Sequence, residues 1–229
     1  MKTKIALLFG VILLLSSCGK TSPTPVAQSK PTSTDQTAFN FSPSEKPTLS
    51  LIPRADGHLL TMKIDNIPSK LVSLEYELVY TASDNGNDIE KGLGDTVKLN
   101  NEPSLTRDLL LGTASCTSGC KYKYDNNVNS GTVTLTFMTA DNQVNTFDAP
   151  FTLDSGADIK KTGGMFLKDN SMGFKGKPIS SADYYVLVKN YLGGFSVFSS
   201  GNGKGTVTEN TPSSLTKKDK TTLTGDYLP

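Results

Sequence analysis

The segment Ser73-Leu74-Glu75-Tyr76-Glu77-Leu78-Val79-Tyr80 alternates apolar and polar side chains along most of its length. In an extended strand, successive side chains point to opposite faces, so the leucines and tyrosines of this segment would share one face. A strand of this kind belongs to an antiparallel sheet with one face on a core and the other in water. The segment therefore predicts a β protein with half-buried sheets.

The same alternation occurs on both sides of this segment. Leu60, Met62 and Ile64 alternate with polar residues upstream, and the runs 132–137 and 147–153 do so downstream. Further strands are expected at residues 48–52, 96–99, 105–111, 120–124, 164–168, 184–191 and 195–199. Because apolar residues do not recur at helical spacing over three turns, helix is expected to be minor.

Gly, Asn, Asp and Pro separate these strands at intervals of about ten residues, which is typical of a β-sandwich. We predict an all-β chain with an immunoglobulin-like antiparallel β-sandwich at residues 47–157. A C-terminal β extension at 158–208, with a possible strand at 205–208, is favoured over a separate β subdomain. Residues 209–229 are polar and are expected to form a flexible tail.

The N-terminus has the pattern of a secretory signal. Lys2 and Lys4 precede an apolar run at residues 5–15, which is too short to span a bilayer. The following Leu15-Ser16-Ser17-Cys18 resembles the bacterial lipobox, in which a peptidase cuts before a lipid-modified cysteine. We expect a signal peptide at 1–17 and acyl chains such as palmitate on Cys18, anchoring an extracytoplasmic protein to the cell membrane. The alternative is an ordinary secretory signal with a cysteine at its cleavage site.

Residues 18–46 contain the lipidated cysteine followed by a stretch rich in Ser, Thr and Pro. A stretch with so few apolar residues cannot offset its chain entropy by burial, so a disordered, extended tether is expected. The chain has 23 Lys and Arg against 22 Asp and Glu, and removal of Lys2 and Lys4 leaves 21 against 22. A near-neutral chain without a basic cluster does not favour nucleic acid as a partner.

Cys116 and Cys120 remain as an even pair once Cys18 is used by the anchor. In an oxidising compartment they are expected to form a disulfide at a hairpin tip, worth roughly 2 kcal/mol for so small a loop. A redox couple would place two residues between the cysteines, and here there are three. Zinc requires four ligands, whereas the chain offers these two thiols and His58. A structural disulfide is therefore favoured over redox or metal roles.

His58 is the only histidine, and it follows Asp56-Gly57 before a predicted strand. An exposed turn residue is the simplest interpretation. A Ser-His-Asp triad could use His58, but the Gly-x-Ser-x-Gly motif of a nucleophile elbow does not accompany it. No catalytic residue is assigned, the chain is not predicted to be an enzyme, and a hydrolase with an unusual site remains a third hypothesis.

Two segments offer ligand chemistry. Asp84, Asn85, Asp88 and Glu90 surround a glycine and are calcium candidates, but their spacing does not match an EF-hand, and an Asn-Gly hairpin loop is the simpler interpretation. No other cofactor is expected. Aromatic faces can stack on sugars, so a platform is conceivable from Tyr122, Tyr124, Tyr184, Tyr185 and Tyr191. Tyrosines that alternate on strands are more often core or cross-strand residues. The glycine-rich residues 201–205 are expected to form a flexible turn.

The segments 74–80, 132–137 and 147–153, together with Leu109-Leu110-Leu111-Gly112-Thr113 and the two cysteines that follow it, resemble a group of lipoproteins from small-genome candidate-phylum bacteria. The resemblance covers roughly residues 45–200. No activity is attached to that group, so it implies an immunoglobulin-like architecture and a membrane-anchored location only.

The leading hypothesis is a noncatalytic cell-surface lipoprotein whose β-sandwich presents loops or a sheet edge to a surface protein or glycan. The alternative is a lipoprotein that binds a small ligand or calcium, with a role in transport. Fold alone does not distinguish these functions, so the geometry and chemistry of a binding site are needed to choose between them.

Overall fold

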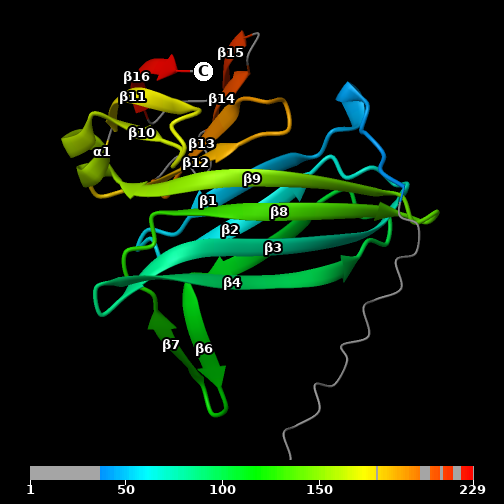
Figure 1. Ribbon diagram of the computed structural model, residues 1–229, viewed down its shortest axis with the longest axis horizontal. Coiled ribbons are helices and arrows are strands. Elements are labelled where there is room, and N and C mark those ends of the chain that lie inside the picture. Colours follow the sequence, from blue (N-terminus) through cyan, green and yellow to red (C-terminus); the bar gives the residue numbers. More distant parts are fainter. Residues whose placement is uncertain (1–36, 179, 202–206, 212–213, 219–222, 229) are drawn as a thin grey trace, which may run out of the picture. The chain divides into compact units, whose positions relative to one another are not determined.

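The computed structural model describes residues 37–178, 180–201, 207–211, 214–218 and 223–228. Its strands are β1 (Thr48–Pro53), β2 (Leu59–Asp65), β3 (Leu71–Asp84), β4 (Asn87–Lys98), β5 (Leu105–Leu110), β6 (Gly112–Cys116), β7 (Cys120–Tyr124), β8 (Ser130–Thr139), β9 (Val144–Ser155), β10 (Gly164–Phe166), β11 (Gly173–Pro178), β12 (Tyr184–Lys189), β13 (Phe195–Ser199), β14 (Val207–Thr211), β15 (Ser214–Lys218) and β16 (Leu223–Leu228). The helices described are a 3-10 turn, η1 (Pro43–Glu45), and α1 (Gly156–Thr162). The prediction of a mostly β chain with little helix is confirmed (Figure 1).

The strands form antiparallel sheets. An eight-stranded sheet has the order β15-β14-β13-β12-β9-β8-β3-β4, and two three-stranded sheets have the orders β1-β2-β5 and β10-β11-β16. A two-stranded sheet, β6-β7, completes the set. The first strands predicted from alternation, at 60–64, 74–80, 132–137 and 147–153, correspond to β2, β3, β8 and β9.

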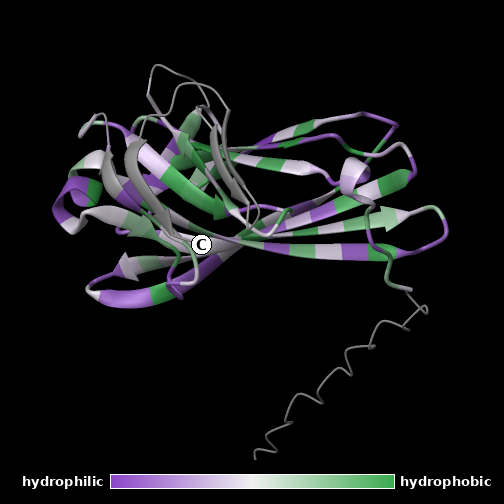
Figure 2. Cartoon of the chain, turned by 90° about the horizontal axis from the view of Figure 1, so that it is seen from above, coloured by the Kyte–Doolittle hydropathy of each residue, from purple (hydrophilic) through white to green (hydrophobic). Residues whose placement is uncertain are grey.

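The main core lies between β1-β2-β5 and the part of the long sheet formed by β3, β8 and β9, whose inward-facing residues make one hydrophobic cluster. In β3, Leu74 and Leu78 are buried while Glu75 and Glu77 are exposed, as the alternation predicted. Figure 2 shows hydrophobic and hydrophilic residues alternating along the strands of this sheet. The two sheets therefore form a β-sandwich.

β12 and β13 are buried on both faces. In β12, Val186 and Val188 join the main core, whereas Tyr185 and Leu187 join a second cluster with residues of β10, β11 and α1. Because β12 pairs directly with β9, these strands extend the sheet of the sandwich. Strands after residue 157 therefore contribute to the main core, and two-sided burial explains why residues 184–188 form an apolar run without alternation.

α1 covers part of this second cluster, to which it contributes Ile159. Its N-cap is Ser155, whose Oγ accepts the Asp158 N–H at 3.1 Å, and its C-cap is Gly163, which has a left-handed φ of 80°. These are ordinary capping signals, although no helix was predicted at this position. Among the described residues, no helix has the length and apolar character needed to cross a membrane.

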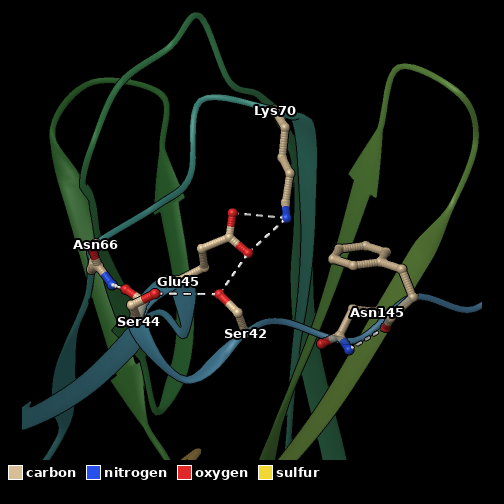
Figure 3. Close-up of polar contacts among 7 residues, drawn as sticks. Ser42, Ser44, Glu45, Asn66, Lys70 and Asn145 are labelled. Atoms are coloured by element: carbon tan, nitrogen blue, oxygen red, sulfur yellow. Dashed lines mark hydrogen bonds and ion pairs between the residues drawn. The ribbon is translucent and has the colours of Figure 1, made fainter.

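The predicted tether is too long at its C-terminal end. Phe41 is buried in the main core, with its ring 5.6 Å from that of Phe137, and Phe39 packs against it at 5.0 Å between ring centroids. The Asn145 side chain also donates to the Phe39 carbonyl at 2.8 Å (Figure 3). Burial of the Phe41 ring and partial burial of the Phe39 ring offset the cost of ordering a polar segment. The predicted signal peptide, Cys18 and the predicted tether up to residue 36 lie outside the described residues.

The predicted flexible tail at 209–229 is also wrong where it is described. β14 and β15 lengthen the eight-stranded sheet, and β16 pairs with β11. Backbone hydrogen bonds to an existing edge strand do not require an apolar sequence, which is why composition concealed these strands. The strand predicted at 205–208 overlaps β14 at residues 207–208, and residues 202–205 of the predicted glycine-rich turn lie outside the described residues.

Candidate functional site

The β6-β7 hairpin is inserted between two sandwich strands, β5 and β8, and forms a sheet of its own. All side chains of β7 are exposed, and so are those of β6 after Gly112. In Figure 1 the hairpin stands away from the sandwich strands. A hairpin without a hydrophobic face is at best marginally stable in water, so other interactions must hold this one.

A disulfide closes the tip of the hairpin. Cys116 and Cys120 are directly opposed in the β6-β7 register and are bonded, with 4.1 Å between their Cα atoms. Gly119 lies in the turn with a φ of 118°, a conformation that favours glycine. This agrees with the disulfide pair predicted from the sequence.

The base of the hairpin is tied to the sandwich by backbone hydrogen bonds. The Leu111 N–H donates to the His58 carbonyl, and the Asp125 N–H donates to the Leu111 carbonyl, each at 3.0 Å. A Cβ added at Gly112 would lie 2.3 Å from the Lys123 carbonyl oxygen, so only glycine fits where the chain enters the hairpin. The hairpin is thus fixed at both ends.

Asp125 also connects the hairpin base to β3 and β4. Its buried carboxylate accepts a hydrogen bond from the Tyr80 hydroxyl at 2.7 Å and one from the Lys91 ammonium at 2.5 Å. Burial works to raise the pKa of Asp125, but the hydrogen bonds from Lys91 and Tyr80 outweigh it and the pKa is lowered. Asp125 therefore stays ionised, and its two hydrogen bonds link the base of the hairpin to β3 and β4.

Tyr122 and Tyr124 of this hairpin make a stacked row of aromatic rings with His58 of the β1-β2 loop. The Tyr124 ring lies parallel to the His58 ring, with 4.5 Å between centroids, and nearly parallel to the Tyr122 ring at 6.2 Å. Tyr122 is 57 % exposed and Tyr124 is 37 % exposed, two of the most exposed large apolar side chains described. Exposed aromatic side chains of this kind are typical of recognition surfaces.

Arg54 holds the row in place from the β1-β2 loop. Its guanidinium donates to both carboxylate oxygens of Asp56, at 2.7 and 2.6 Å, and to the Tyr124 hydroxyl at 3.2 Å. The hydrogen bond from Arg54 is the main cause of the lowered pKa of Asp56. Asp56 in turn accepts the His58 backbone N–H at 3.1 Å. A bidentate pair of this geometry orients the loop that carries His58.

A polar pocket of about 380 Å³ adjoins the row, and it is lined by His58 of the row and by Asp56. Its other walls come from residues 125–129, from β9 and α1 through Asp154 and Asp158, and from Tyr184. Gly57 permits the close approach of Tyr184, because an added Cβ would lie 2.4 Å from its ring. Segments distant in sequence therefore meet to form a cavity lined by carboxylates, amides and aromatic rings.

Asp154 is the most perturbed acid of this pocket. Burial, with a smaller contribution from the charge of Asp158, raises the pKa of Asp154 to about 6. A mostly buried carboxyl group in a polar cavity can either donate or accept a hydrogen bond near neutral pH. The pocket can therefore bind hydroxyl groups in both directions.

The structure brings together some of the predicted site residues and separates others. Tyr122 and Tyr124 lie together and Tyr184 lines the adjoining pocket, but Tyr185 is fully buried and Tyr191 packs elsewhere, against Phe147. The five tyrosines therefore do not form one platform, and Tyr185 and Tyr191 pack in or against the hydrophobic clusters, as the favoured interpretation of these tyrosines predicted. His58, predicted as an exposed turn residue, is partly buried by stacking.

The calcium candidates lie on the β3-β4 hairpin, as the simpler interpretation predicted. Asp84 pairs with Asn87 across a turn whose central residues, Asn85 and Gly86, have φ values of 50° and 83°. This is the two-residue turn that Asn-Gly favours. In the described part of the chain, no group of three or more His, Cys, Asp or Glu side chains is placed to hold a metal ion.

Sequence reasoning missed the roles of Arg54, Asp56 and Asp154. Arg54 and Tyr124 are 70 positions apart, so their contact leaves no local signal. Comparisons with protein-family models, curated proteins and solved structures gave no match to the chain. The site must therefore be interpreted from its own geometry.

Proposed function

We propose that the chain is a lipid-anchored, extracytoplasmic, noncatalytic protein that binds a glycan through the stacked row Tyr122, Tyr124 and His58. The observation that carries the proposal is this exposed row, on a hairpin with no hydrophobic core of its own, beside a pocket lined by carboxylates and amides. Pyranose rings present a C–H face that packs on aromatic rings and hydroxyl groups that hydrogen-bond to acids and amides. The site offers both.

The location belongs to the same proposal and rests on the sequence. The lipobox-like Leu15-Ser16-Ser17-Cys18 would place the lipid on Cys18, and the polar residues between it and residue 37 would separate the folded part from the membrane. The bonded pair Cys116 and Cys120 fits an oxidising compartment. Replacement of Cys18 by Ser should release the protein from the membrane fraction, and unchanged fractionation would contradict the anchor.

We also propose that the sandwich is immunoglobulin-like. The support is its strand order, β1-β2-β5 against β4-β3-β8-β9, in which the chain crosses from one sheet to the other between β2 and β3, between β4 and β5, and between β5 and β8. In this arrangement, the β6-β7 hairpin is an insertion in the connection between two sandwich strands. Such connections commonly carry binding residues, because the scaffold tolerates changes in them.

Glycan binding can be tested on the full-length protein with Cys18→Ser, which removes the predicted anchor. A glycan array should identify ligands, and calorimetry on the best of them should give saturable binding. Tyr122→Ala should weaken binding about tenfold, which corresponds to roughly 1.4 kcal/mol, whereas Tyr122→Phe should keep the ring face and most of the affinity.

Val72→Ala is a matched control, because Val72 is an exposed apolar residue of β3 outside the hairpin. It should leave binding unchanged. The absence of any glycan ligand, or equal loss in the Tyr122 and Val72 variants, would overturn the glycan proposal. Hydrolysis of a bound glycan by the parent protein would overturn its noncatalytic part.

A further inference from the structure

β4 forms one edge of the eight-stranded sheet, and none of its residues is buried (Figure 1). It has 12 residues, about twice the usual length of a strand, and β3 is its only strand partner among the described residues. A long edge strand presents a row of backbone N–H and C=O groups with which another strand can pair. This edge is therefore a candidate interaction surface, and it contains no residue of the aromatic row.

The β3-β4 register shows which backbone groups face the open edge. Asp84 and Asn87 flank the two-residue turn, and the residues that flank such a turn form a hydrogen-bonded pair. Alternate residues from Asn87 onward therefore bond to β3, and the even-numbered residues from 88 to 98 direct their backbone groups away from it. Two contacts agree with this phase. The Ser83 N–H donates to a carbonyl outside β4 at 2.9 Å, and the Thr96 N–H donates to the carboxylate of its neighbour at 2.8 Å.

The sequence of β4 is nearly symmetric about Leu93. Residues at equal distances from it are both glycine, both apolar, both polar or of opposite charge. In order of increasing distance, these pairs are Gly92 and Gly94, Lys91 and Asp95, Glu90 and Thr96, Ile89 and Val97, and Asp88 and Lys98. A second copy of β4, running antiparallel with Leu93 opposite Leu93, would therefore match the first residue by residue.

The apolar residues of β4 all lie on the face that packs on the main core. Ile89, Leu93 and Val97 are only partly buried there by the rest of the chain. In the antiparallel pair, side chains of directly opposed residues touch on one face of the sheet. Ile89 would then meet Val97 of the second copy, and Leu93 would meet Leu93, so the pairing would complete a strip that one chain leaves half covered.

The charged residues complement each other on both faces. Lys91 would lie opposite Asp95 on the core-side face, and Asp88 opposite Lys98 on the outer face, and twofold symmetry makes each pair occur twice. Lys91 already donates to Asp125, but its side chain stays 33 % exposed and an ammonium group has three donors. It can therefore bond to both carboxylates.

Other registers lose this complementarity. Moving the axis by one position along β4 would set Lys91 opposite Leu93 or Val97. Moving it by two positions would set Lys91 or Asp95 opposite its own copy, and like charges directly opposed are destabilising. Charges on an edge strand commonly prevent pairing, whereas these oppose the shifted registers and favour one.

We propose that β4 pairs antiparallel with β4 of a second copy of this chain, about a twofold axis at Leu93. The pairing would join two eight-stranded sheets into one continuous sheet. The matched charges of β4 carry the proposal, which is independent of glycan binding by the aromatic row.

The test is sedimentation velocity on the full-length protein with Cys18→Ser, over a concentration series from about 1 to 200 µM. We expect a reversible equilibrium between monomer and dimer, with a Kd of about 1–100 µM. Circular dichroism shows whether each variant described next is folded.

Two charge reversals test the register. Asp88→Lys and Lys98→Asp each place like charges opposite each other twice in the dimer, so each should weaken dimerisation at least about tenfold. The double variant restores opposite charges and should dimerise like the parent. An equimolar mixture of the two single variants should do the same, because a dimer with one chain of each pairs every charge with its opposite.

Lys160→Asp is the control, since it makes the same change of charge at an exposed residue of α1. It should dimerise like the parent. Dimerisation that a single variant weakens and that the double variant or the mixture restores supports the proposal, whether or not any glycan binds. A protein that stays monomeric over this range, a dimer that neither folded single variant weakens, or a loss that neither combination restores would overturn it.

Discussion

The β3-β4 hairpin turns at Asn85-Gly86 and sends alternate residues of β3 into the main core, whereas the β6-β7 hairpin contributes no side chain to either hydrophobic cluster. Burial of a large apolar side chain is worth about 1.5–3 kcal/mol, so residues such as Leu74 and Leu78 hold β3 in place. β6-β7 relies instead on one disulfide, worth roughly 2 kcal/mol, and on the stack at its base.

This difference separates the strands that stabilise the fold from the hairpin that we propose binds a glycan. A substitution on β3 is constrained by the core, while β7 can change its exposed side chains without disturbing any packed cluster. The cross-link keeps β7 extended, so that Tyr122 and Tyr124 share a face at almost no cost to the sandwich. A surface that must vary its specificity is best placed on such an element.

The largest expected effect is in the core. Leu78→Ala should lower the free energy of unfolding by about 2–5 kcal/mol, because the fully buried side chain leaves a cavity. Urea unfolding followed by circular dichroism measures it. Val79→Ala, at the next position of β3 and facing away from the core, should cost much less. Similar losses in the two variants would contradict the one-sided burial of β3.

Asp125 lies at the base of the β6-β7 hairpin and accepts hydrogen bonds from Tyr80 of β3 and Lys91 of β4. Its replacement should cause the next largest loss of stability. Asp125→Ala leaves the Tyr80 hydroxyl and Lys91 without their partner and should cost about 2–3 kcal/mol. Because the folded pKa of Asp125 is lowered, its contribution is complete above its ordinary value of 3.8 and is lost as the pH falls through the folded pKa. The cost of the substitution should therefore shrink in acid.

Removal of the disulfide should destabilise the β6-β7 hairpin and leave the sandwich strands almost unchanged. In the double variant Cys116→Ser and Cys120→Ser, opening of β6-β7 should become easier by about 2 kcal/mol, which is roughly 30-fold faster amide exchange. Exchange of the β3, β8 and β9 amides should change little. An equal acceleration throughout the sandwich would mean that β6-β7 is part of its cooperative unit.

Asp154 lines the pocket beside the aromatic row. Its contribution to the free energy of unfolding should change with pH in the opposite direction to that of Asp125. Its pKa is raised from 3.8 to about 6, so the folded state holds a proton that the unfolded state loses, and stability falls as the pH rises through this range. Asp154→Asn should match the parent below pH 3.8 and exceed it by about 3 kcal/mol above pH 7. Unfolding midpoints across pH measure the difference, and a parallel pH profile in the variant would contradict the raised pKa.

Strand positions could be predicted because alternation is a local consequence of one-sided burial. The Leu74–Tyr80 segment carries this alternation, and the continuous apolar run at 184–188 is the corresponding signal of burial on both faces. Phe39 and Phe41 were missed because a polar segment concealed one partly buried and one buried ring, and β14 to β16 because edge pairing needs only a backbone. The disulfide followed from cysteine count and compartment.

Only part of the site could be predicted from the sequence, for a related reason. Tyr122 and Tyr124 stand two apart on one strand, which the sequence reveals, but Arg54, Asp56 and His58 reach them from the β1-β2 loop. Contacts across 70 positions depend on the sandwich as a whole. Residues that act together on different loops therefore need the fold before they can be grouped.

Two glycines give the smallest and most discriminating test of the comparison. Gly86 and Gly119 both have positive φ, 83° and 118°, and an added Cβ at either would meet nothing within 4 Å, so alanine introduces backbone strain alone. Gly86→Ala should lower the free energy of global unfolding by about 1 kcal/mol, because the β3-β4 turn closes a strand of the core. Gly119→Ala should change it by no more than about 0.5 kcal/mol, since β6-β7 can open locally before the sandwich unfolds. Equal losses from chemical denaturation would show that the two hairpins unfold together.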